Sequence, residues 1–312
     1  MNYSPPIFLF NGHLETIYPA LLRKVTLQPY HRERITTPDN DFLDLDWLKQ
    51  GSEKLVIISH GLEGNTHRAY IKGMARALFL NGFDVLAWNY RGCSEEMNRQ
   101  LRFYHSGATD DLAVVINHAV KQQYKAINLV GFSLGGNLTL KYLGEPRKHP
   151  DVLRKAIVFS VPLDLHTSCL KISQPSNWIY ANRFLVSLKE KVQRKARMMP
   201  ELDSKGLGKI KSLMEFDDVI TGPLHGFSNA LDYYAQCSSI KFVNGINHPV
   251  LIINAKNDPF LSKECYPVNE LEHHSKVKFI APQRGGHVGF AEFNSNGLYW
   301  SERQAIAFLT HD

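Results

Sequence analysis

The chain has 312 residues, of which 44% are hydrophobic and 21% charged, a balance typical of folded globular proteins and too apolar for a disordered chain. Its 36 Lys and Arg against 30 Asp and Glu give a net charge of +6, which by itself indicates neither a nucleic-acid-binding nor a strongly acidic protein. No apolar run reaches the roughly 18 residues of a membrane-spanning helix, and no export signal is recognisable. We therefore expect a soluble, cytoplasmic protein whose four widely spaced cysteines are free thiols and form no zinc site.

The first regular elements expected along the chain are two antiparallel strands. After the turn at residues 37–40, residues 43–47 alternate apolar side chains with Asp44 and Asp46. Alternation with a period of two predicts a strand with one solvent-exposed face, paired in a hairpin with residues 32–36.

Short continuous apolar runs then alternate with helical stretches. The expected strands are residues 55–59, 83–88, 126–130, 155–161, 249–254 and 277–280, and the expected helices include 70–80, 134–143 and one that begins at Thr109. Apolar runs of this kind are typical of strands buried on both faces, and the alternation indicates right-handed βαβ units. The sequence therefore predicts an α/β fold with a mostly parallel central sheet.

The connection between the expected strands at 155–161 and 249–254 is unusually long. Residues 162–248 make 87 residues, whereas an ordinary crossover needs about 10 to 30. We expect this surplus to be a helical cap inserted between an N-terminal part of the core, 1–161, and a C-terminal part, 249–312.

The segment Gly131–Gly135 (GFSLG) matches the motif G-x-S-x-G, between an expected strand and an expected helix. This context is typical of a nucleophile elbow, in which a sharp turn exposes the serine hydroxyl. The flanking glycines let strand and helix approach closely, and the helix amino terminus stabilises negative charge. Ser133 is therefore the candidate nucleophile.

A serine hydroxyl needs a base, and the base needs an orienting acid. In this architecture the chain order is serine, acid, histidine, and His287 follows the last expected strand in a glycine-rich loop. Two acids satisfy the order, Asp258 after the strand at 249–254 and Asp164 after the strand before it. We favour Asp258, with Asp164 as an alternative whose other role would be a turn or a helix cap.

An attacked ester also needs two backbone N–H groups aimed at the developing oxyanion. The residue after the nucleophile, Leu134, supplies one candidate, and Leu62, in the loop after the first parallel strand, supplies the other. The neighbouring His60 is expected to support the loop and not to act as a second base.

Together these segments resemble the α/β-hydrolase superfamily, and within it the YheT-like branch, also called the AB hydrolase 4 group. The resemblance covers nearly the whole chain and rests on residues 11–16, 43–47, 60–64, 89–93, 131–137, 257–260 and 285–290. It implies a triad of Ser133, Asp258 and His287 and a carboxylesterase-like activity, with phospholipases and medium-chain acyl-ester synthases among eukaryotic relatives. Glu15 stands where the branch commonly has Gln.

The expected cap has a basic stretch, with nine Lys or Arg and three acids between residues 183 and 211. One reading is attraction of an anionic substrate or peripheral contact with a lipid headgroup. The favoured reading is a solvated helical face. No nucleic-acid-binding motif accompanies the stretch, so no nucleic-acid partner is expected.

The sequence as a whole predicts a serine carboxylic-ester hydrolase that forms an acyl-enzyme with short- to medium-chain, small-molecule or lipid-like acyl esters. This chemistry requires no metal and no organic cofactor. Two alternatives stay open, an acyltransferase or ester synthase with the same triad, and a non-catalytic binding module on a hydrolase scaffold. A dehalogenase of this fold is disfavoured because its nucleophile is Asp, whereas position 133 is Ser.

Overall fold

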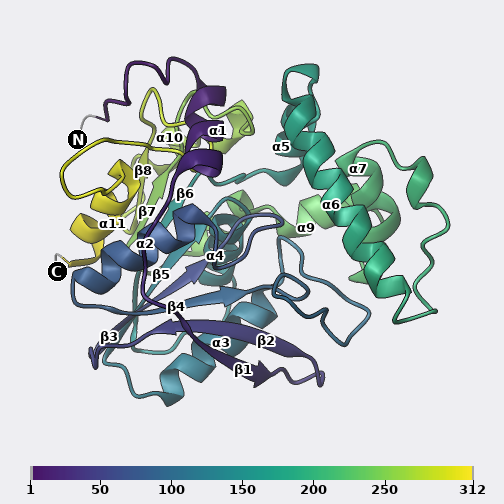
Figure 1. Cartoon of the computed structure of the whole chain (residues 1–312), viewed down its shortest axis with the longest axis horizontal. Coiled ribbons are helices and arrows are strands. Elements are labelled where there is room, and N and C mark those ends of the chain that lie inside the picture. Colours follow the sequence, from purple (N-terminus) through teal and green to yellow (C-terminus); the bar gives the residue numbers. More distant parts are fainter. Residues whose placement is uncertain (1–2, 311–312) are drawn as a thin grey trace.

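Eight strands form a single sheet in the computed structural model, which describes residues 3–310 (Figure 1). The strands are β1 (His31–Thr36), β2 (Phe42–Leu48), β3 (Lys54–Ser59), β4 (Asp84–Asn89), β5 (Ala126–Phe132), β6 (Leu153–Phe159), β7 (Val250–Ile253) and β8 (Val277–Ile280). Their order across the sheet is β1-β2-β4-β3-β5-β6-β7-β8. The pairs β1–β2 and β2–β4 are antiparallel and all other pairs are parallel. The predicted mostly parallel sheet with antiparallel N-terminal strands is confirmed.

Helices cover both faces of the sheet, which explains the continuous apolar runs. Leu55 and Ile57 of β3 pack in one core with α3 (Thr109–Lys121) and α4 (Leu134–Gly144). Val56 and Ile58 point the other way, into a second core with α2 (Ala69–Leu80) and α11 (Trp300–Thr310). Each such side chain contributes about 1.5–3 kcal/mol on full burial. The sheet is therefore a rigid platform for the loops at its edge.

The alternation in β2 has a different meaning from the one expected. Asp44 and Asp46 are buried, each with 1% side-chain exposure, so the predicted solvent-exposed face is wrong. Arg34 of the edge strand β1 binds Asp44 through two hydrogen bonds of 2.7 and 3.0 Å, and Arg32 binds Asp46 in the same way at 2.5 and 3.0 Å. Two-pronged arginine–carboxylate pairs satisfy the buried charges, so aspartates alternate along a strand that is covered on both sides.

The segment between β6 and β7 is helical and lies beyond the carboxyl ends of the parallel strands, on the right in Figure 1, with α11 on the far left. Its elements are α5 (Leu165–Ile172), η1 (Pro175–Asn177), α6 (Trp178–Ala196), η2 (Leu207–Lys209), α7 (Leu213–Phe216), the π-helical turn η3 (Asp217–Thr221), α8 (Gly222–Leu224), α9 (Ala230–Cys237), η4 (Ser239–Lys241) and η5 (Val243–Gly245). A separate apolar cluster joins these helices, with Leu185, Val192, Phe216 and Tyr233 among its members.

The remaining helical elements lie before β1 and between β7 and β8. They are α1 (Gly12–Leu22), η6 (Lys263–Cys265) and α10 (Val268–Leu271). No helix within residues 3–310 is both long and apolar enough to cross a membrane.

The basic stretch at residues 183–211 is not a uniform solvated face. Arg183, Arg194 and the basic residues from 197 onward are exposed, as expected. Lys195 is fully buried, and the side chain of Lys191 is only 10% exposed. Both lysines of α6 point into the protein, because carboxylate and carbonyl oxygens on neighbouring loops bind their ammonium groups. The solvated-face interpretation is therefore wrong for these two positions.

Candidate active site

Ser133 occupies a strained turn between β5 and α4. Its backbone φ of 52° and ψ of −119° lie in a region that side-chain-bearing residues seldom adopt. The turn is held because the Ser133 N–H donates to the Phe159 carbonyl at 2.9 Å, at the end of β6. A Cβ atom on Gly135 would lie 2.5 Å from the carbonyl oxygens of Ser59 and His60. The second glycine of the motif is thus required by the close approach of α4 to β3.

Three side chains from distant parts of the chain meet at this turn. Ser133 Oγ lies 3.0 Å from Nε2 of His287, and Nδ1 of the same ring lies 2.9 Å from Oδ2 and 3.1 Å from Oδ1 of Asp258. The Asp258 side chain has no exposure, and the His287 side chain has 11%. This is the geometry in which an acid orients an imidazole toward a serine hydroxyl.

The alternative acid, Asp164, lies elsewhere. It is the N-cap of α5, where Oδ1 accepts hydrogen bonds from the backbone N–H and the hydroxyl of Thr167 at 2.8 and 2.7 Å. A capping carboxylate already used in this way satisfies the helix amino terminus. The structure therefore gives Asp164 the capping role and brings Asp258 to the histidine.

Helix α1 supports the loops that carry the acid and the histidine. Glu15 Oε2 accepts from Asn257 Nδ2 at 2.6 Å and from the Gly285 N–H at 2.9 Å. The His287 N–H donates to Thr16 Oγ1 at 2.9 Å. Sequence reasoning missed these supporting contacts, since nothing in the residue types of 11–16 indicated that they face the site. The only available signal was that this segment carried part of the family resemblance.

His60 has the supporting role that was expected. It is fully buried, and burial lowers the pKa of its imidazole to about 3, so the ring is neutral. Its Nδ1–H donates to the Gly61 carbonyl at 2.8 Å, and Nε2 accepts from the Tyr90 N–H at 3.3 Å. Both ring nitrogens are thus engaged in shaping the loop after β3.

The turn after β3 leaves one amide free beside the serine. The Gly61 N–H donates to Tyr70 Oη and the Glu63 N–H to Tyr104 Oη, both at 2.9 Å. Leu62 lies between these anchored amides, and within residues 3–310 its own N–H has no hydrogen-bond acceptor. The turn is therefore rigid on both sides of a single unused donor.

A second amide without an acceptor among the described residues directly follows the nucleophile in the chain. Leu134 is the first residue of α4, where backbone N–H groups have no partner within the helix. Leu62, Leu134 and Ser133 line the same pocket. Two residues from different elements, each with an unused backbone amide, therefore line the pocket that contains Ser133.

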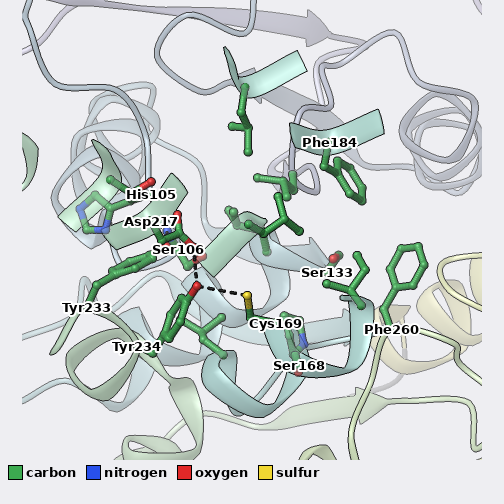
Figure 2. Close-up of a pocket in the computed structure, with 18 of the residues that line it drawn as sticks. His105, Ser106, Ser133, Ser168, Cys169, Phe184, Asp217, Tyr233, Tyr234 and Phe260 are labelled. Atoms are coloured by element: carbon green, nitrogen blue, oxygen red, sulfur yellow. Dashed lines mark hydrogen bonds between the residues drawn. The ribbon is translucent and has the colours of Figure 1, made fainter. Parts of the chain in front are cut away.

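This pocket has a volume of about 150 Å³ and runs from Ser133 into the helical segment (Figure 2). Phe184 and Phe260 lie near the serine, and the opposite end carries His105, Asp217 and both Tyr233 and Tyr234. The remaining lining is largely apolar and includes Leu165, Ile172, Leu188, Leu213 and Leu261. The pocket is therefore apolar along its walls and polar at its far end.

Asp217 gives that far end an unusual electrostatic character. Burial raises the pKa of its carboxyl group to about 6, and Tyr234 Oη donates to Oδ2 at 2.7 Å. Asp217 begins the π-helical turn η3, a rare geometry that often occurs at functional sites. Sequence reasoning missed the polar residues at this end of the pocket, because they are spread from residue 105 to residue 234 and match no motif.

Comparisons with known proteins agree with this geometry. A family model described as serine aminopeptidase, S33 matches residues 50–266. The protein named "Putative esterase YheT" from Escherichia coli K12 is 34% identical over 289 residues, which cover 90% of this chain and 84% of that protein. Human phospholipase ABHD3 is 29% identical over 305 residues, covering 93% of this chain and 74% of its own length.

Solved structures show the same fold. The Pyrococcus furiosus esterase Pf2001 aligns with a TM-score of 0.60 at 16% identity, covering 99% of this chain and 97% of its own. The family match extends over more than half of the chain, and the identity to the Escherichia coli relative extends over most of both sequences. The chain therefore belongs to the α/β-hydrolase superfamily, within its YheT-like branch, and is an ester hydrolase of the serine type.

Proposed function

We propose that this ester hydrolase works through a covalent acyl-enzyme formed on Ser133. The observation that carries the proposal is the unbroken chain of contacts from Ser133 Oγ to His287 Nε2 at 3.0 Å and from His287 Nδ1 to Asp258 at 2.9 Å. His287 removes the hydroxyl proton as Ser133 attacks the ester carbonyl, then returns it to the leaving alcohol. Water, activated by the same imidazole, releases the acid. Asp258 orients the ring and stabilises the imidazolium that forms in each half-reaction.

The oxyanion of each tetrahedral intermediate is held by the N–H groups of Leu62 and Leu134. The free Leu62 amide between two anchored neighbours supports this role. Preorganised amides of this kind are effective because no rearrangement is needed when charge develops.

The acyl group is short to medium in length and occupies the apolar part of the pocket. A cavity of about 150 Å³ is comparable to an engineered apolar cavity that holds benzene, which indicates an acyl group of about six carbons. The polar far end supports the same limit, since a longer chain would press methylene groups against the Asp217 carboxyl. The helices of residues 162–248 act as a cap domain that completes the acyl side of the pocket.

The enzyme is further proposed to be cytoplasmic, which fits its four buried, free cysteine thiols. The exposed basic residues of the stretch at 183–211 would attract an anionic surface, such as that of a micelle or bilayer containing a lipid-like substrate.

Hydrolysis of p-nitrophenyl esters from acetate to palmitate tests the proposal. We expect the highest kcat/KM near hexanoate and loss of activity in Ser133→Ala. A folded wild-type protein with no activity across the series, or a Ser133→Ala variant with wild-type activity, would contradict it. Adding a primary alcohol then separates hydrolysis from acyl transfer, because the proposal requires the free acid to dominate the products.

A further inference from the structure

The carboxyl group of Glu63 is buried within the turn that follows β3. Its side chain is 8% exposed, and its backbone φ of 50° is in the left-handed region. Tyr104 binds this residue twice, accepting from its N–H at 2.9 Å and donating to Oε1 at 2.7 Å. Glu63 directly follows Leu62, so its anchored backbone restrains Leu62 from the C-terminal side, as the Gly61 N–H bonded to Tyr70 does from the N-terminal side.

Helix α6 supplies the other partners of the same carboxyl group. Lys191 Nζ donates to Glu63 Oε1 at 2.6 Å, and Ser187 Oγ donates to Oε2 at 2.6 Å. These donors lie four residues apart, on one face of a helix that belongs to the segment between β6 and β7. The Lys191 ammonium also lies 3.1 Å from the thiol of Cys93, a residue of the central core, so this contact holds the ammonium group against the core. A buried ion pair thus joins the helical segment to the turn.

We propose that Lys191 is a positioning residue, which through Glu63 holds the Leu62 amide in its oxyanion-binding direction only while α6 is docked on the core. The proposal rests on the function proposed above, because it assumes that the Leu62 amide binds the oxyanion. It assigns the helical segment a catalytic consequence beyond covering the acyl group, since undocking of α6 would loosen the turn.

The electrostatics favour this arrangement. Burial alone would raise the pKa of the Glu63 carboxyl, but Lys191 and the hydrogen bonds from Ser187 and Tyr104 outweigh it, so the pKa is lowered and the group stays ionised. A buried carboxylate without its cation is strongly destabilised, so it either shifts to a solvated position or takes up a proton. A residue other than glycine with a left-handed backbone conformation, such as Glu63, also needs contacts with its surroundings to maintain that conformation. Removing Lys191 therefore releases the turn from its constrained geometry.

The test compares Lys191→Met with Lys189→Met. Both changes remove one positive charge from the same helix, but within residues 3–310 Lys189 Nζ binds only the Ile210 carbonyl, which belongs to the helical segment itself. Loss of one oxyanion donor costs about 10²–10³ in kcat, so a misdirected donor in Lys191→Met should cost about 10- to 100-fold, with KM changed less than about threefold. Lys189→Met should keep kcat within about twofold of wild type.

Binding of a hexyl trifluoromethyl ketone supplies a readout that a purely structural role would not move. This ketone forms a tetrahedral adduct with the serine, so its affinity should fall in Lys191→Met by the same factor as kcat/KM. The matching methyl ketone, which forms little adduct, should bind about as well as it binds wild type. Equal losses for both ketones would overturn the proposal.

A double variant separates positioning from stability. In Glu63→Gln/Lys191→Met no buried charge is left unpaired, so its Tm should recover toward that of wild type while kcat stays low. If kcat recovers together with Tm, or if Lys191→Met matches Lys189→Met, the positioning role is wrong. An inactive wild-type enzyme would instead overturn the proposed function, so the two failures are distinguishable.

Discussion

The two ends of the pocket are built in different ways. At the serine end, the geometry comes from the backbone, with Ser133 at a φ of 52° and Gly135 pressed against the carbonyls at the end of β3. At the far end, it comes from side chains on helices, with Asp217 on a π-helical turn and Tyr234 on α9. Backbone geometry demands particular residue types, whereas a side-chain lining accepts many. The first end should therefore resist substitution, and the second should tolerate it and adjust the choice of substrate.

The largest expected effect distinguishes the two candidate acids. Asp258→Asn leaves the shape of the site intact but favours the wrong tautomer of His287, so kcat should fall about 10³- to 10⁴-fold, as in the serine-protease triad. Asp164→Ala is the matched control, because it removes only the N-cap of α5 and should cost about 1 kcal/mol of stability. Steady-state kinetics and denaturant unfolding measure both. A larger loss of kcat in Asp164→Ala would reverse the assignment.

A glycine-to-alanine pair tests the difference between the two regions directly. The Cβ of Gly135→Ala would lie 2.5 Å from two backbone oxygens, so the variant should lose about 2–3 kcal/mol of stability together with most of its activity. For Gly208, in the helical segment, no atom of residues 3–310 outside its local backbone and chain neighbours lies within 4 Å of such a Cβ. Gly208→Ala should be neutral or gain about 0.4–1 kcal/mol through reduced freedom of the unfolded chain. Equal stability of the two variants would contradict the comparison.

A smaller effect depends on pH and concerns Asp217. Its pKa is raised to about 6 in the folded protein, whereas the unfolded carboxyl titrates near 3.8, so the free energy of unfolding falls as pH rises between these values. Asp217→Asn cannot titrate and keeps an acceptor for Tyr234. The free energy of unfolding of the variant, relative to that of wild type, should therefore be about 2 kcal/mol higher at pH 8 than at pH 4. Urea unfolding at both pH values measures this difference. A difference that does not change with pH would show that burial does not raise the pKa of the Asp217 carboxyl.

Much of the serine end could be predicted from the sequence because its physics constrains residue types. The glycines of the motif at 131–135 and of the loop around His287 are required by close backbone approaches. The same two segments indicated in the sequence where the strands before them end. The strand at 277–280 was predicted with the bounds that β8 has, and the other strands differ by a few residues at their ends. Continuous apolar runs identify strands that are covered on both faces.

What could not be predicted depends on long-range pairing. Asp44 and Asp46 were expected to face solvent, since a single strand does not reveal that Arg32 and Arg34 of its partner neutralise them. Lys191 was part of a basic stretch, and only the fold brings it to Glu63, 128 positions away. Charged residues read alone indicate exposure, whereas a partner from another element reverses that conclusion.

The central claim is that Ser133 is the nucleophile of an acyl-enzyme. Its most direct test is intact-protein and peptide mass spectrometry after reaction with a fluorophosphonate, an acyl-ester mimic that bonds to an activated serine. The account predicts one adduct per chain, located on Ser133 and absent from Ser133→Ala. A folded wild-type protein that stays unlabelled, or a label on another residue, would contradict the account.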